Sequence, residues 1–118
     1  MSINFQAALG LHGDALQLRT ERSSILAANI ANENTPGYQA RDMDFASALA
    51  GRRQVGGGTA DDSSLALYRV PYHPSLDGNT VEIGVEQAAF SQNASDYEAS
   101  LAFINMTLRG LAKSIAGQ

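Results

Sequence analysis

The 118-residue sequence contains no cysteine and no tryptophan, and it has only four tyrosines and four phenylalanines. The absence of cysteine excludes disulfide bonds and thiol chemistry. Because aromatic side chains supply much of the buried area of a protein core, their scarcity argues against one large core. A chain of this length forms one domain at most.

Basic residues are also few, and they are scattered. Eight lysines and arginines stand against twelve acidic residues, which gives a net charge of −4 and no basic stripe, so nucleic acid is not expected as a partner. No apolar run approaches the roughly 20 residues of a membrane-spanning helix. The first residues, Met1–Gln6, lack the charged and apolar regions of a cleavable secretory signal. Composition alone therefore indicates a cytosolic protein.

Motifs for catalysis or metal binding are missing too. His12 and His73 have no metal-ligand spacing, and His12 is expected to be a surface or packing residue. The glycines at 56–58 are not followed by Gly-Lys-Ser/Thr, so they form no phosphate loop. Asp42 and Asp44 are expected to be solvated charges. The sequence therefore predicts no enzyme, no cofactor and no metal site.

The N-terminal part of the sequence predicts one long helix over residues 3–33 with two apolar stripes. The first stripe is Ala8, Leu11, Ala15, Leu18, Ile25 and Leu26, and the second is Phe5, Leu9, Leu16, Ala27 and Ile30. Two stripes indicate two packing partners, either two helices of a bundle or, in so short a chain, another molecule. Gly10 and Gly13 each cost roughly 1 kcal/mol relative to alanine. Residues 3–13 are therefore expected to be disordered in the isolated protein.

The C-terminal part carries the strongest periodic signal, a heptad seam with alternating steps of four and three residues. The seam is Phe90, Ala94, Tyr97, Leu101, Ile104, Leu108, Leu111 and Ile115. A second apolar face behind it is Ala99, Ala102, Phe103, Met106 and Gly110. The helix is expected to begin between Asn79 and Glu86, with Asn79 as its N-cap and Glu82 completing a capping box, and to end at Gly117.

The middle of the chain, residues 39–80, is irregular. Phe45–Leu49 predicts one or two helical turns, and the glycine-rich stretch 51–64 predicts a mobile loop. Leu65–Val70 predicts a short strand, and 74–79 is a turn-rich connector.

These segments together predict a mainly α fold of one axial domain. It would comprise an N-terminal helix and turn at 1–38, a loop-rich middle segment at 39–80 with a short β-strand or hairpin, and a C-terminal heptad helix at 81–118. The two long helices would pair as an antiparallel, coiled-coil-like hairpin. One stripe of each helix can pair within the chain, and the remaining two would be exposed association surfaces. This surplus favours a subunit of an assembly.

A family resemblance is carried by the end of the N-terminal helix. Asn29-Ile30-Ala31-Asn32, followed by Asn34-Thr35-Pro36-Gly37-Tyr38, resembles the N-terminal signature of the bacterial flagellar axial proteins, the rod and hook family. Three further stretches are similar to the proximal rod branch of that family: Ala40–Phe45, Leu76–Val81 and Tyr97–Leu111. Together the matching stretches cover well over half of the chain.

The resemblance implies a structural subunit of the flagellar basal-body rod, part of the motor drive shaft, whose terminal helices polymerise into the wall of a tube. The implied partners are other rod subunits, the rod-base adaptor FliE and the flagellar export gate. The implied location is the periplasmic side of the inner membrane, reached through type III export without signal cleavage. Phe45 and Leu49 match the Phe-x-x-x-apolar element that the gate reads in related proteins, although a plain amphipathic turn has the same form.

Two other classes of function stay open at this point. A small helical chaperone or adaptor of a type III-like export system would be a stable dimer and would need neither the Pro-Gly turn nor the long loop. An enzyme would need a catalytic constellation, which the sequence does not contain.

Overall fold

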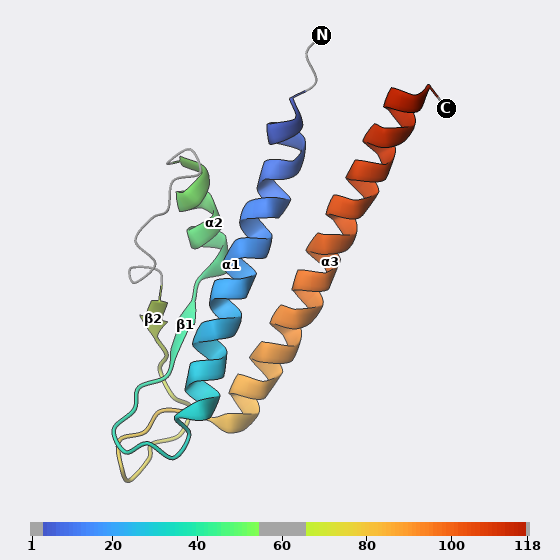
Figure 1. The fold of residues 1–118 in the computed structure, drawn as a ribbon. Coiled ribbons are helices and arrows are strands. Elements are labelled where there is room, and N and C mark those ends of the chain that lie inside the picture. Colours follow the sequence, from blue (N-terminus) through green and yellow to red (C-terminus); the bar gives the residue numbers. More distant parts are fainter. Residues whose placement is uncertain (1–3, 55–65, 118) are drawn as a thin grey trace.

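The computed structural model describes residues 4–54 and 66–117, without the side chains of residues 5–8. It is elongated, with extents of 65 × 27 × 18 Å, and two long antiparallel helices run along its length (Figure 1). The elements follow in the order α1 (Phe5–Ala31), β1 (Arg41–Met43), α2 (Phe45–Gln54), β2 (Ala66–Tyr68) and α3 (Ile83–Ala116). The predicted mainly α fold with a helical hairpin and a short β element is confirmed.

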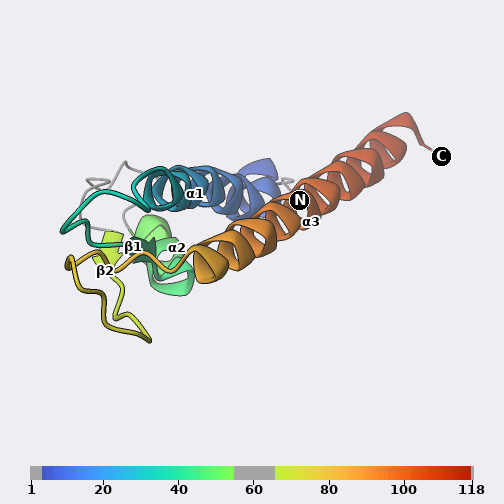
Figure 2. The ribbon, with the colours of Figure 1, turned by 90° about the horizontal axis from the view of Figure 1, so that it is seen from below.

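The helix α1 lies between two partners of the same chain (Figures 1 and 2). α3 packs along one side, and the layer formed by α2, β1 and β2 packs on another. The small core between α1 and this layer contains Leu18, Met43 and Ala48, with Ile25, Phe45 and Leu49 packed against it. Within the first stripe of α1, Ala15, Leu18 and Leu26 are therefore buried inside the chain, whereas Leu11 is 37% exposed.

The middle segment is more ordered than its composition predicts. β1 and β2 pair antiparallel, with Arg41 opposite Tyr68 and Met43 opposite Ala66. β2 confirms the predicted strand, whereas its partner β1 was not predicted. α2 extends to Gln54, so the expectation of a loop from residue 51 is wrong for its first four residues, and the rest of that stretch lies outside the described residues.

The N-terminal residues are helical from Phe5 onward, contrary to the expectation of disorder. Gly10 and Gly13 lie within α1, and no atom would come within 4 Å of a Cβ built at either position. α3 ends as predicted, because Gly117 has a φ of 72° and its N–H points to the last carbonyls of the helix.

The turn that follows α1 is held by a side chain from far along the sequence. The buried Asn79 amide nitrogen lies within hydrogen-bond distance of the carbonyls of Asn32 (2.9 Å), Glu33 (2.8 Å) and Thr35 (2.8 Å), which share its two N–H donors. These carbonyls belong to the turn that follows α1, so the Asn79 side chain ties that turn to the segment before α3. The prediction that Asn79 caps α3 is therefore wrong: the N-cap is Glu82, which makes no side-chain capping bond.

Candidate assembly surface and the polar network behind it

The most buried positions on the face of α3 that packs on α1 are polar. The buried residues of α3 are Glu86, Asn93 and Ser100, spaced seven residues apart, and we call them the polar row. The Asn93 amide donates to the backbone carbonyl of Arg19 (2.8 Å) and to the hydroxyl of Ser23 (2.7 Å). Hydrogen bonds, rather than apolar residues alone, therefore hold the two long helices together.

Two further contacts join α1 and α3. The Arg19 guanidinium lies 3.2 Å from the Asp96 carboxylate, which is partly solvated, so this pair contributes about 1 kcal/mol at most. The His12 ring stacks on Phe103 with 5.6 Å between ring centroids. The expectation that His12 is a surface or packing residue is confirmed. These pairs also establish that α1 and α3 run antiparallel.

The predicted heptad seam divides into two rows with different environments. Tyr97, Ile104 and Leu111 are half-buried beside α1, and Phe90 in the same row is 39% exposed. The second row, Ala94, Leu101, Leu108 and Ile115, is exposed, and we call it the outer row. No residue of the seam is buried. The seam is therefore not the centre of the helical hairpin, because the polar row occupies that position.

Other predicted surface residues are placed as follows. On the second face of α3, Ala99, Phe103 and Met106 are all exposed. On α1, the residues of the two stripes divide by burial: Leu18 is buried, Leu9, Leu16, Ile25 and Ile30 are half-buried, and Leu11 is 37% exposed. Phe5 and Ala8 have no described side chains.

A further exposed apolar group was missed by sequence reasoning. It lies on the strand β2 and on the connection toward α3, and it consists of Leu67, Tyr68, Val70, Tyr72 and Leu76. No helical or strand period links these residues, because only Leu67 and Tyr68 lie on a strand and the other three lie on irregular chain. Only their exposure in the tertiary structure identifies them as a surface.

The turn motif that carries the family resemblance is built around Asn29, which is buried. Its amide donates to the Arg41 carbonyl (2.6 Å) and to the Glu86 carboxylate (2.9 Å). Its carbonyl oxygen accepts from the Arg41 N–H (3.1 Å) and from the Tyr38 hydroxyl (3.4 Å). Asn29 therefore connects α1, β1 and α3, which are far apart in sequence.

The rest of the motif forms the turn itself. The Asn32 side-chain amide donates to the Ala28 carbonyl, and the Thr35 hydroxyl donates to the side-chain oxygen of Asn32. Gly37 has a φ of 73°, a backbone conformation in which a residue with a side chain would be strained. Its N–H donates to the Asp77 carbonyl. Asn34 and Pro36 are exposed. The motif is thus mainly a structural junction within the chain.

A chain of charges extends from this junction. Arg22 makes a bidentate ion pair with Asp42 (2.8 and 3.0 Å), and Arg69 bridges Asp42 (2.6 Å) and Glu86. Burial tends to raise the pKa of Asp42, but hydrogen bonds from Arg22, from the Met43 N–H and from Arg69 outweigh it and lower the pKa. The expectation that Asp42 is a solvated charge is therefore wrong.

The candidate export element, Phe45 and Leu49, takes part in folding. Both side chains pack against the core, and the Arg19 guanidinium lies 4.0 Å from the centre of the Phe45 ring. Neither residue is freely displayed in the folded chain. A protein that binds these two side chains would have to do so before the domain folds.

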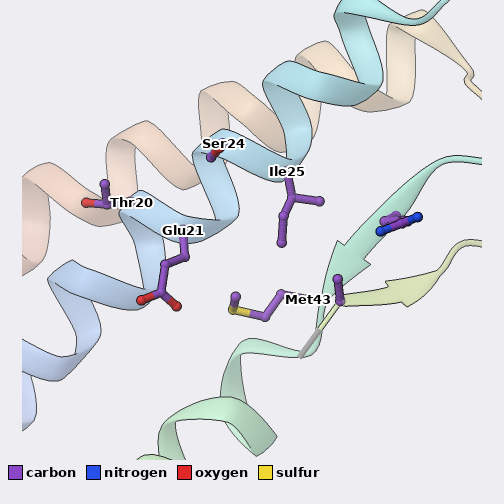
Figure 3. Close-up of a pocket in the computed structure, with 7 residues that line it drawn as sticks. Thr20, Glu21, Ser24, Ile25 and Met43 are labelled. Carbon is purple, nitrogen blue, oxygen red and sulfur yellow. The ribbon is translucent and has the colours of Figure 1, made fainter. Parts of the chain in front are cut away.

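One open groove lies between α1 and the β layer (Figure 3). It has a volume of about 450 Å³ and is lined by Thr20, Glu21, Ser24, Ile25, Arg41, Met43 and Ala66. Within the described ranges, no three His, Asp or Glu side chains are grouped so that they could hold a metal ion. In the same part of the chain, no helix combines the length and hydropathy that a membrane crossing requires.

Comparisons with known proteins match the chain to one family. The family model described as flagella basal body rod protein matches residues 9–39. The chain is 44% identical to the flagellar basal body rod protein FlgB of Cereibacter sphaeroides, over 97% of this chain and 98% of the relative. It is 42% identical to FlgB of Salmonella typhimurium, over 94% of each chain, and 40% identical to FlgB of Escherichia coli K12, over 89% and 90%.

Proposed function

Since the chain belongs to the FlgB family of flagellar basal body rod proteins, we propose that its two terminal helices build the proximal part of the rod by polymerising with neighbouring subunits. The chain is a structural subunit of the rod and is located in the flagellar basal body. Nothing in the comparisons supports the alternative of an export chaperone.

The observation that carries this proposal is the outer row of α3. Leu101 is 40%, Leu108 46% and Ile115 73% exposed, on one continuous line along the helix. Covering a large aliphatic side chain fully contributes roughly 1.5–3 kcal/mol, so covering the exposed part of each contributes about 1 kcal/mol. Several subunits that bury such rows together would gain enough to hold a filament, whereas one pair would associate weakly.

Charge in the outer row tests the proposal. Leu101→Asp and Leu108→Asp should each abolish swimming and rod assembly while the protein is still made, because assembly would bury an unpaired carboxylate. Ser95→Asp is the control, since it adds the same charge at an exposed polar position of α3 that lies on another side of the helix from the outer row. Normal motility in both leucine variants, measured in soft agar beside the control, would rule out the outer row as an assembly surface.

Export and partners are the finer part of the proposal. The subunit would travel unfolded through the type III apparatus without signal cleavage and then fold on the periplasmic side of the inner membrane, where FliE and other rod subunits would receive it. Phe45 and Leu49 would be read by the export gate at the unfolded stage, which fits their packing in the folded chain.

Secretion tests this finer part. Phe45→Ala should lower the exported fraction while the cytoplasmic level stays constant. Phe103→Ala is the control, because it also removes a phenylalanine but lies on α3, where the ring is exposed. Equal export of both variants would show that Phe45 is not part of a recognition element.

A further inference from the structure

The polar row and the outer row are adjacent along α3. Asn93 is followed by Ala94, and Ser100 is followed by Leu101. One residue position corresponds to a turn of about 100° around a helix. If α3 were turned by one position about its own axis, the outer row would therefore face α1, and the polar row would move toward solvent.

Apolar burial by itself does not decide between the two rotations. The turned arrangement would cover Leu101 and Leu108, which are exposed in the structure, and would return the polar row to water, but it would carry the half-buried Ile104 and Leu111 away from α1. The observed arrangement even leaves one polar atom unsatisfied, because the Asn93 carbonyl oxygen is buried without a hydrogen-bond partner in the described part of the chain. Such an atom lowers stability, so Asn93 is an unfavourable choice if stability alone matters.

Specific hydrogen bonds oppose the turn. The Asn93 amide donates to the Arg19 carbonyl and the Ser23 hydroxyl on α1, and both bonds require Asn93 to face that helix. At the start of α3, the buried Glu86 is held by the Asn29 amide and by Arg69. These contacts exist only in the observed rotation of α3.

We propose that the polar row is a rotational lock, which holds α3 with its outer row facing away from α1 at a cost in stability. Single polar residues buried between paired helices fix one arrangement among several in the same way. Asn93 is then a positioning residue. It contacts α1 and no neighbouring subunit, and it determines which side chains of α3 face such a subunit. The use of the outer row in assembly rests on the function proposed above, whereas the lock itself does not.

Disulfide trapping in the dilute protein tests the lock, since the chain has no cysteine of its own. His12 and Phe103 are stacked, so a His12→Cys/Phe103→Cys pair should oxidise readily, and a His12→Cys/Ile104→Cys pair should report the turned state. Adding Asn93→Ala should shift the ratio of the two yields toward the second pair by about fivefold or more, the factor expected when one net hydrogen bond is lost.

Ser95→Ala is the control, because it removes a polar side chain at an exposed position of α3 that faces away from α1 in both rotations, and it should leave the ratio unchanged. An unchanged ratio with Asn93→Ala, or loss of helix by circular dichroism, would overturn the lock, since Asn93 would then be neutral or simply stabilising. Rod assembly is scored separately, by the swimming of Asn93→Ala cells without added cysteines. A shifted ratio with normal swimming would support the lock and contradict its role in assembly.

Discussion

Replacing Asn29 with alanine should lower the free energy of unfolding by about 3 kcal/mol, because three well-formed hydrogen bonds of about 1 kcal/mol each would be lost. The three bonds join the Asn29 side chain to the Arg41 carbonyl, the Arg41 N–H and the Glu86 carboxylate, at 2.6, 3.1 and 2.9 Å. The longer contact with Tyr38, at 3.4 Å, contributes little. A small domain has roughly 5–15 kcal/mol in total, so this is a large fraction.

Urea unfolding followed by circular dichroism measures the loss. Asn34→Ala is the matched control, because Asn34 belongs to the same turn but is exposed, and its replacement should change stability by less than about 0.5 kcal/mol. Asn29→Asp should be worse than Asn29→Ala, since it places a second carboxylate against that of Glu86 in a buried site. If Asn29→Ala costs no more than the control, the junction does not hold the domain together.

Two further predictions concern the same region. The pKa of Asp42 is lowered in the folded protein, so the stability that its ionised form contributes is present above the ordinary value of 3.8 and is lost as the pH falls through the lower folded-state pKa. Asp42→Asn should flatten that acid-side loss in urea melts at stepped pH, and an unchanged profile would refute the role of the Arg22 pair. Gly37→Ala should cost about 1 kcal/mol in thermal melts, because its φ is positive, whereas Gly51→Ala, within α2, should be neutral or stabilising.

The partners of the buried polar side chains could not be predicted from sequence pattern and became clear only in the tertiary structure. Asn79 has the neighbours of a helix N-cap, and a capping box with Glu82 is the natural interpretation. Its amide instead binds the turn that follows α1, more than 40 residues away in sequence. The partners of a short polar side chain can come from anywhere in the fold, so spacing along the chain cannot predict them.

The same limit applies to charges. Asp42 lies in a segment without periodicity, where a solvated carboxylate is the usual outcome. In the structure it joins Arg22 on α1 to Arg69 beyond β2. The strand β1 was missed for the same reason, because three residues become a strand only when a partner strand lies alongside.

The sequence by itself determined both long helices, the Pro-Gly turn after α1 and the glycine that ends α3. These features depend on residues within a turn or two of one another, through helical periodicity, fixed proline φ and the freedom of glycine at positive φ. It also determined that more apolar helix surface exists than two helices can share.

Only the tertiary structure decided which surface is left over. A heptad pattern states that residues lie on one line, but it does not state which line faces the partner helix. That choice is made by the hydrogen bonds that Asn93 donates to α1 and that Glu86 accepts from Asn29 on α1, and they direct the outer row, with Leu101 and Leu108, toward solvent. The physical reason is that a buried polar group must find its partner in one geometry, whereas apolar contacts accept many.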